Sequence, residues 1–297
     1  MSEVPAVGVA RFENARLSRR DLLVTTDSGD IVYESALNQW AVLESNGILD
    51  SILPADGARV KGSHVLLGHP WSFGYYHWLF EALPRLSLID AIPELSELPL
   101  ILPGDAKPFQ LESIVRVGID IDRLWRPSTE VSVVDRLYLP TLFAPSGVPS
   151  PKAVAWLRRA FLAAEDTQPP TGRRLYLSRS DAPQRRLLNE EEVVGYLTSV
   201  DYEVVRAGDY SFDEQVSIFA GVTHVVAPHG AAVSNMAFAP RGTQLIELFG
   251  DSYVNGCYWA LASILDQPYG CVIGKSEGLD YTVSLGRLKQ VMANLRG

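Results

Sequence analysis

The sequence predicts an α/β protein with two domains, and three observations support this prediction. From residue 173 onward, short apolar runs alternate with capped helical stretches, which is typical of parallel strands covered by helices on both faces. The chain has 297 residues, of which 47% are hydrophobic, and this suffices for two packed cores of ordinary domain size. A Pro-rich segment at 139–151 interrupts both patterns. It indicates a linker, with one domain at 1–145 and a second at 150–297.

The first half of the chain is the less regular one. Its expected strands are "LLVTT", "DIVYES", "HVLLGHP", "LPLILP", "DRLWRP" and "VVDRLYLP". Its expected helices are a long one within "GYYHWLFEALPRLSLIDAI" and a shorter one at "KPFQLESIVRVG". A second α/β domain is the simplest interpretation.

The second half is more regular. Its expected strands are "RRLYLSR", "YEVVR", "THVVAP", "TQLIELF" and "YGCVI", and its expected helices are "NEEEVVGYLTSV", "QVSIFAG", "GAAVSNMAFA" and "SYVNGCYWALASILD". Asn189 with Glu192, and Ser211 with Glu214, have the spacing of capping boxes at the first two helices.

Charge and cysteine usage exclude several classes of protein. A formal net charge of −9 disfavours nucleic-acid and anionic-membrane surfaces, which require a basic field. The two cysteines, Cys257 and Cys271, form neither a CxxC pair nor a disulfide framework, so we expect a reducing compartment and no structural zinc. We identify no secretory signal and no transmembrane segment. The expected location is the cytoplasm, and peripheral association with the inner face of the membrane stays open.

Basic and small residues follow two strands of the second half. Arg179 comes directly after the first strand, and Arg185 and Arg186 lie in the loop beyond. Ligands of open α/β sheets bind at the carboxyl ends of the strands, where a guanidinium can hold phosphate oxygens bidentately. The alternative is that these arginines pair with surface carboxylates.

The stretch "THVVAPHGAAVSNMAFAP" turns a strand into a predicted helix at His229 and Gly230. Gly230 permits a tight turn, and the amides that follow, including that of Ala231, can form an anion site at the start of the helix. His229 can bond a phosphate or a ribose hydroxyl. Asn235 is ambiguous, because an Asn in such a helix can bond locally. Glu247, near the end of the next strand, can accept the hydroxyls of a ribose or be an ordinary strand-end carboxylate.

In the first half, "LLGHPWSFGYYHWLFEALPRL" places His77, Glu81 and Arg85 on one face of the long helix, at i, i+4 and i+8. A histidine and a carboxylate one turn apart can act as a base with its orienting partner. The alternative is a common i,i+4 surface pair or a capped core histidine.

Other motifs fail on inspection. In "GCVIGKS" only three residues separate the glycines, where a phosphate-binding P-loop requires four. The "DID" at 120–122 lies just past a predicted helix end at Gly118 and has no phosphate-cradling loop nearby, which argues against a metal site there. The absence of Gly-x-Gly-x-x-Gly disfavours nicotinamide and flavin cofactors.

The pairing of "YHWLFEALPRL" with "RRLYLSRSDAPQRRLLNEEE" and "HVVAPHGAAVSNMAFAPRGTQLIELF" resembles glycosyltransferase family 61, over about residues 65–250. The resemblance implies a GT-B type fold, with two Rossmann-like domains of parallel sheets facing across a cleft. It implies an inverting hexosyl- or pentosyltransferase of polysaccharide or glycoconjugate biosynthesis that needs no metal or other cofactor. The co-substrate would be a nucleotide sugar, usually a UDP-sugar, and the acceptor a glycan or lipid-linked glycan. The family motif usually has glycine where this chain has Ala232.

Under this resemblance Arg179 and His229 would contact the diphosphate and Glu247 the ribose, with Arg186, Gly230, Ala231 and Asn235 in the same donor site. Inversion needs a base that deprotonates the acceptor hydroxyl, and the candidates in order are Glu81, His77 and His69. Two alternatives remain at this stage: a nucleotide-sugar epimerase of related architecture, and a catalytically degenerate nucleotide- or glycan-binding module.

Overall fold

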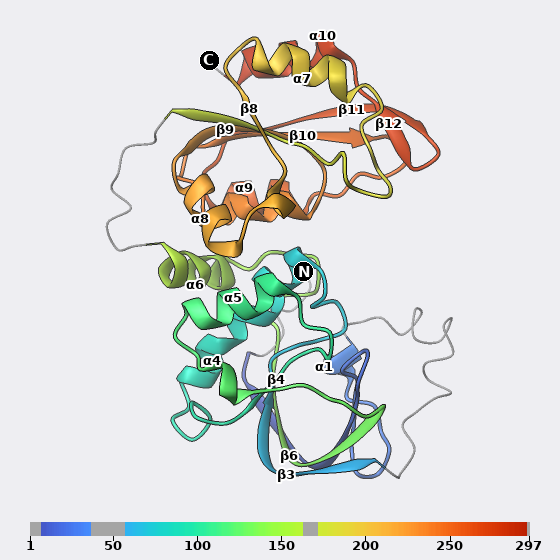
Figure 1. The fold of residues 1–297 in the computed structure, drawn as a ribbon, viewed down its shortest axis with the longest axis vertical. Helices are drawn as coiled ribbons and strands as arrows, with labels where there is room; N and C mark the ends of the chain where they lie inside the picture. The colour runs from blue at the N-terminus through green and yellow to red at the C-terminus, as the bar shows by residue number, and fades with distance from the viewer. Residues whose placement is uncertain (1–6, 37–56, 163–171, 296–297) are drawn as a thin grey trace. The chain divides into compact units, whose positions relative to one another are not determined.

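A computed structural model describes residues 7–36, 57–162 and 172–295 of the chain (Figure 1). Its contacts divide the chain into two compact units, Met1–Trp156 and Leu157–Gly297. The boundary falls within helix α6, Pro151–Phe161, just beyond the Pro-rich segment. Each unit is described separately below.

The N-terminal unit contains a six-stranded sheet in the order β2-β1-β6-β3-β4-β5. Its strands are β1 Val9–Ser18, β2 Val24–Thr25, β3 Ala58–Leu66, β4 Leu100–Ile101, β5 Leu124–Trp125 and β6 Val131–Pro140. β6, β3, β4 and β5 are parallel, whereas β1 runs antiparallel to β6 and β2 antiparallel to β1. The sheet is therefore mixed, whereas the resemblance implied a parallel sheet.

Helices of several types accompany this sheet. They are α1 Tyr33–Ala36, α3 Tyr75–His77, the π-helix η1 Trp78–Ala82, the 3-10 helix η2 Leu83–Arg85, α4 Leu86–Asp90, α5 Pro108–Arg116 and the 3-10 helix η3 Ile121–Arg123. Leu17, Leu66 and Leu137 are fully or almost fully buried in the core of the unit. Each such leucine stabilises the fold by roughly 1.5–3 kcal/mol.

Two predictions for the N-terminal unit were wrong in detail. "DIVYES" is not a strand: the amide of Val32 donates to the carbonyl of Val24, and the Ser35 hydroxyl accepts from the Val24 amide, so a turn leads into α1. The long helix changes type three times between residues 75 and 90. Pro84 has no N–H to donate to the preceding turn, which explains why a regular α-helix does not continue through it. The strand β1 was not predicted.

The C-terminal unit has a second six-stranded sheet, in the order β12-β11-β10-β9-β7-β8. Its strands are β7 Arg173–Leu177, β8 Glu203–Val205, β9 Val222–Pro228, β10 Gln244–Gly250, β11 Tyr269–Glu277 and β12 Asp280–Thr282. All are parallel except β12, which pairs antiparallel with β11. The predicted strands are confirmed, and β12 is an addition.

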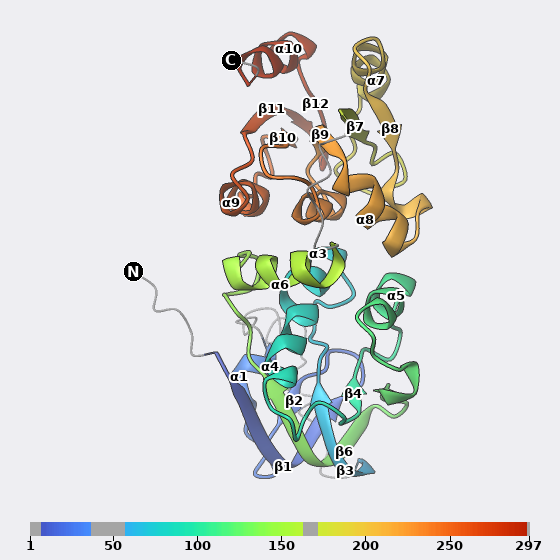
Figure 2. The ribbon, with the colours of Figure 1, turned by 90° about the vertical axis from the view of Figure 1, so that its left-hand side faces the viewer.

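Helices cover both faces of this sheet. They are α7 Glu190–Thr198, α8 Phe212–Ala220, α9 Cys257–Ile264 and α10 Leu285–Asn294, with the short 3-10 helices η4 Ala207–Asp209 and η5 Ala231–Ala237. α7 and α10 lie on one face, where they pack on the strands, and α8 and α9 lie on the other (Figure 2). The chain leaves β7 toward the first face and β9 toward the second. In the sheet, β8 lies on one side of β7 and β10 lies on the opposite side of β9. The direction of the strand order therefore reverses between β7 and β9.

The two predicted capping boxes have different outcomes. Ser211 and Glu214 form one at the start of α8. At α7 the Asn189 side chain makes no capping bond. Its amide group donates to Glu192 and to the Val283 carbonyl, and its oxygen accepts from the Val283 amide. Asn189 therefore ties the start of α7 to the segment after β12.

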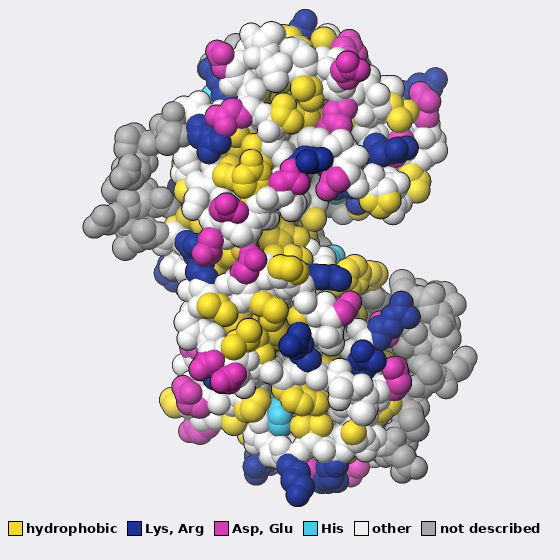
Figure 3. Space-filling view, in the orientation of Figure 1, with side chains coloured by type: hydrophobic (Ala, Val, Ile, Leu, Met, Phe, Trp, Pro, Cys, Tyr) yellow, Lys and Arg dark blue, Asp and Glu magenta, His cyan; other side chains and the backbone are white. Residues whose placement is uncertain are grey.

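Two surface features bear on function. On the face seen in Figure 3, acidic and basic side chains are interspersed rather than gathered by sign. Among the helices described, none has the length and apolarity needed to cross a membrane.

Candidate functional site

The N-terminal unit brings His77 and Glu81 together where α3 meets the π-helix. His77 Nδ1 lies 2.9 Å from Glu81 Oε2. The His77 side chain is 29% exposed, whereas that of Glu81 is 3% exposed. Because a carboxylate can only accept, the His77 Nδ1–H donates to it, and Nε2 of the neutral ring is left as an acceptor. π-Helical turns occur frequently at functional sites.

The Glu81 carboxylate is held by a second element, the Pro-rich segment after β6. The Ser146 hydroxyl donates to it, at 3.1 Å from both oxygens, and the Gly147 amide donates to Oε1 at 2.7 Å. Together with His77, these donors occupy much of the accepting capacity of a buried carboxylate. Glu81 is thus fixed in place, and the side chain with access to solvent is His77.

His69 lies beside this pair but deeper. It is 2% exposed, and its Nδ1 accepts from the Trp71 amide at 3.3 Å. The proton of the neutral ring is therefore on Nε2, which faces the His77 carbonyl at 3.4 Å and Glu81 Oε2 at 3.6 Å. Burial lowers the pKa of His69 well below its usual value, and the Arg85 charge lowers it further. His69 is placed to orient the pair rather than to reach a substrate.

Arg85 does not extend the predicted polar stripe to the surface. It is 1% exposed, and its Nη1 donates to the carbonyls of Leu67 and Gly68, just beyond β3. Burial lowers its pKa to about 10, and the nearby Glu81 charge opposes that shift. The shift of helix type after His77 turns this side chain into the unit.

In the C-terminal unit, Arg179 and Gly230 meet at the carboxyl ends of β7 and β9. This is the point where the strand order reverses, and open α/β sheets bind their ligands in that crevice. The half-buried Arg179 guanidinium lies directly against Gly230, since a Cβ on Gly230 would overlap it. The φ of Gly230 is 178°, an extended value open to any residue, so glycine is needed here for space rather than for conformation. The Arg179 side chain donates to the Gln184 carbonyl at 3.5 Å.

His229 also stands at this point and is held by Glu247. Its Nδ1 lies 2.8 Å from Glu247 Oε1, and Tyr269 donates to Glu247 Oε2 at 2.8 Å. Phe249 stacks on the imidazole with ring centres 5.0 Å apart, and Tyr253 and Tyr258 pack around it. His229 is 8% exposed. It lines a cavity of about 10 Å³, room for about one water-sized group, so a larger ligand would sit at its mouth.

The structure does not bear out the direct ribose contact expected of Glu247. The residue lies in the middle of β10 rather than at its end, it is fully buried, and its two oxygens hold His229 and Tyr269. The Glu247 carboxylate therefore holds the His229 ring in place.

Three further predicted donor residues also differ from expectation. Asn235 is fully buried and donates to Gln215 of α8 at 2.9 Å and to the Ala232 carbonyl at 3.2 Å, so its amide group bonds within the C-terminal unit. Arg186 pairs with Asp280 of β12 at 2.6 Å. Ala231 is exposed, and the helix it begins is a seven-residue 3-10 helix rather than an α-helix. Since the macrodipole sums over aligned peptides, this short element provides a weaker anion site than predicted.

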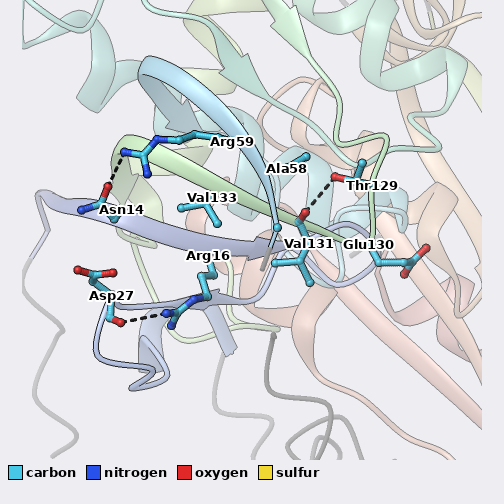
Figure 4. A pocket seen from close by; sticks show the side chains of 10 residues that line it. Asn14, Arg16, Asp27, Ala58, Arg59, Thr129, Glu130, Val131 and Val133 are labelled. Carbon is cyan, nitrogen blue, oxygen red and sulfur yellow. Dashed lines mark hydrogen bonds between the residues drawn. The ribbon is translucent and has the colours of Figure 1, made fainter. Parts of the chain in front are cut away.

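A separate groove of about 890 Å³ lies in the N-terminal unit, at the starts of β3 and β6 (Figure 4). Its cations already have partners: Arg59 donates to Asn14 and pairs with Asp135, and Arg16 donates to the carbonyls of Thr26 and Asp27. The groove is at the amino ends of the parallel strands, opposite to the end where such sheets bind ligands. We assign it no role.

Comparison with protein families decides the class. A family model described as "Glycosyltransferase 61" matches residues 75–246, more than half of the chain. The chain belongs to glycosyltransferase family 61. The family resemblance inferred from the sequence is thereby confirmed, and the match begins at the helix that carries His77 and Glu81 and ends in β10. No curated protein matches the chain.

The α/β architecture with two sheets rich in parallel strands fits a family 61 glycosyltransferase. Within the described ranges, no group of three or more His, Cys, Asp or Glu side chains is arranged to hold a metal ion.

Sequence reasoning missed the residues that hold the two carboxylates of this glycosyltransferase. Ser146 and Gly147 lie in the segment interpreted as a linker, and Tyr269 begins β11 as an ordinary strand residue. The only sequence signal for the first two was a small polar residue and a glycine inside a Pro-rich run that joins a strand to a helix. Nothing local marks Tyr269, because its partner is 22 residues away on the neighbouring strand.

Proposed function

We propose that this family 61 glycosyltransferase moves a sugar from a nucleotide-sugar donor, a UDP-sugar in the first instance, to a hydroxyl of a glycan or lipid-linked acceptor. We propose that the reaction inverts the anomeric centre and requires no metal. The observation that supports this most is the meeting of Arg179, Gly230 and His229 at the point where the strand order of the C-terminal sheet reverses.

On the donor side, the leaving nucleoside diphosphate must be neutralised as the glycosidic bond breaks. Arg179 can hold two phosphate oxygens with its planar fork. In its doubly protonated form, His229 donates from Nδ1 to Glu247 and from Nε2 to a phosphate oxygen. The fixed carboxylate and the three surrounding rings keep the imidazole oriented, so little reorganisation is needed when charge develops.

On the acceptor side, a base must remove the proton of the attacking hydroxyl. We propose His77 for this role, with Glu81 orienting its ring and His69 behind them. This changes the order expected from sequence, in which Glu81 came first. The reason is access: the carboxylate is almost fully buried and already accepts from His77, Ser146 and Gly147, whereas His77 is partly exposed.

The finer attributes of the reaction are proposals of the same kind. For the reaction, we propose hexosyl or pentosyl transfer in polysaccharide or glycoconjugate biosynthesis. For the protein, we propose a GT-B arrangement with domains at 1–145 and 150–297, and a cytoplasmic location with peripheral membrane association. Each unit would then supply one half of the chemistry, the acceptor-side base from the first and the donor site from the second.

Binding measurements with purified protein test the donor site. Ligand that binds only the folded state raises the melting temperature with concentration. Nucleoside diphosphates and their sugars are screened with EDTA and then with Mg²⁺ or Mn²⁺. We expect one nucleotide series to stabilise the parent without metal and to lose this effect in Arg179→Ala and His229→Ala. Stabilisation only with metal would contradict metal independence, and no stabilisation by any nucleotide would overturn the donor site.

Turnover of the donor separates transfer from the alternatives. The donor found in the binding screen is incubated with a panel of glycan acceptors, and free nucleoside diphosphate and product sugars are quantified. Release of diphosphate with formation of a glycoside of inverted configuration supports the proposal. Conversion of the donor to its epimer indicates an epimerase, and binding without turnover a degenerate module.

A further inference from the structure

The loop after β7 carries two adjacent arginines with different environments. Arg186 is fully engaged: its Nε and Nη2 donate to Asp280 Oδ2 at 2.9 and 2.6 Å, and its backbone amide donates to Oδ1 at 2.9 Å. This pairing ties the loop to β12. Arg186 was the loop arginine expected in the donor site, and its partner instead gives it a structural role.

Arg185 faces the candidate site. Its guanidinium carbon lies 4.8 Å from the centre of the Tyr253 ring, and its side chain lines the same small cavity as His229. Cation–π contact of this kind holds a guanidinium in place without neutralising its charge. Tyr253 also packs against the His229 imidazole, at 5.6 Å between ring centres. One aromatic ring thus contacts both the Arg185 guanidinium and the His229 imidazole.

The backbone at Arg185 supports a functional reason for this placement. Its φ is 58°, in the left-handed region that residues with a Cβ seldom adopt. Such conformations persist where the surroundings impose them, and they are concentrated at binding and active sites. The left-handed turn directs the consecutive side chains Arg185 and Arg186 to different partners, Tyr253 and Asp280.

The charges of Arg185 and Arg179 act on one another. The Arg179 pKa is lowered, mainly by burial and next by the positive charge of Arg185. Tyr281, Tyr258 and Asp181 oppose this shift, and across the described part of the chain no ion pair joins either arginine to a carboxylate. Two guanidinium groups that repel each other beside His229 form a site whose charge an anion would balance.

We propose that Arg185, and not Arg186, is the second guanidinium of the diphosphate site, acting with Arg179 and His229. This inference rests on the proposed function, since the anion it names is the diphosphate of the nucleotide-sugar donor. Two guanidinium groups match a ligand with two phosphates, each of which can accept a bidentate pair. A nucleoside monophosphate offers only one such group and would gain less from the second arginine.

The experiment compares the two neighbouring arginines as matched variants. UDP and UMP affinities are measured by calorimetry for the parent, Arg185→Ala and Arg186→Ala. We expect Arg185→Ala to weaken UDP binding by tenfold or more and UMP binding by much less, so that the preference for the diphosphate falls. In Arg186→Ala, UDP binding should change by less than about threefold while the melting temperature falls, because the link to β12 is lost.

A third variant separates binding from folding. Glycine adopts the left-handed region without strain, so Arg185→Gly should melt at the same temperature as the parent or higher. It should nevertheless bind UDP as weakly as Arg185→Ala. UDP binding at parental affinity in both Arg185 variants would overturn this inference and leave the proposed donor site standing. If the parent binds neither UDP nor any other nucleoside diphosphate, the proposed function fails, and the inference fails with it.

Discussion

The N-terminal and C-terminal units each hold a histidine against a buried carboxylate, but they assemble the pair differently. His77 and Glu81 are four residues apart on one helical segment. His229, in contrast, directly follows the end of β9, and Glu247 lies in the middle of the neighbouring strand β10. In both pairs Nδ1 of the histidine faces the carboxylate, at 2.9 and 2.8 Å. In both pairs the carboxylate fixes one ring nitrogen, and in the proposed function the other nitrogen contacts a substrate.

The pairs differ in exposure, and this difference fits the roles proposed for them. The His77 side chain is 29% exposed and the His229 side chain 10% exposed. A base must reach a hydroxyl proton and then release it, which suits the more exposed ring. A group that stabilises a leaving diphosphate works best when fixed and shielded from water, which suits the ring enclosed by aromatic side chains. Four predictions test this division.

The largest effect is expected at His77. Removing a general base slows the chemical step by about 10²–10⁴-fold. His77→Ala should therefore lower kcat by this factor and leave the donor KM nearly unchanged, as measured in a transfer assay with saturating acceptor. Glu81→Gln should have a smaller effect, since the ring remains. Near-parental kcat in His77→Ala together with an inactive Glu81→Gln would make Glu81 the base and would contradict the role proposed for His77.

The second effect concerns the buried carboxylate of the other pair. Glu247→Gln replaces an acceptor of two hydrogen bonds with a group that can accept at only one terminal atom, inside a fully buried site. We expect a loss of about 1–3 kcal/mol in the free energy of unfolding, and weaker binding of UDP. Urea denaturation and calorimetry measure the two. Tyr269→Phe serves as the control, with about 0.5–1.5 kcal/mol lost. Unchanged UDP affinity in Glu247→Gln would show that the pair does not position His229 for the donor.

The third effect isolates the space beside Arg179. In Gly230→Ala the new methyl group would displace the guanidinium, while the extended backbone accepts the alanine without strain. UDP affinity should fall about tenfold, which corresponds to about 1.4 kcal/mol, with little change in melting temperature. Gly195→Ala is the matched control: no atom lies within 4 Å of its added Cβ, and it sits inside α7. That variant should be stabilised by about 0.4–1 kcal/mol and bind UDP normally. Equal binding by the two variants would contradict the contact.

The smallest effect is a pH dependence from His69. Its pKa in the folded unit is lowered, so between pH 6.5 and that lower value the unfolded chain binds a proton that the folded unit does not. The stability of the N-terminal unit should therefore be greatest above pH 6.5 and decrease as the pH falls below it. Melting scans from pH 8 to pH 5 measure this. His69→Asn keeps an acceptor near the Nδ1 position and should flatten the acid limb of the profile. The same slope in both proteins would assign it to other groups.

Sequence reasoning predicted the C-terminal strands, the family and the positions of His77 and His229 in the fold, because these depend on local pattern. Strand and helix periodicity, and the strand-end position of His229 and Arg179, are visible in a few adjacent residues. The helical spacing of His77 and Glu81 likewise made their contact predictable. The same local reasoning failed at Asn189, Asn235 and Arg186, whose partners Val283, Gln215 and Asp280 are distant in the chain.

The sequence by itself thus determined the α/β class, the family and the residue types available for chemistry. The tertiary structure alone decided which of them are free to act. It buried Glu81 under Ser146 and Gly147, enclosed Glu247 between His229 and Tyr269, and separated Arg185 from Arg186. The physical reason is that a polar side chain binds a ligand only through hydrogen-bond donors, acceptors or charge that are not already paired within the fold. That remaining capacity is set by partners brought from far along the chain.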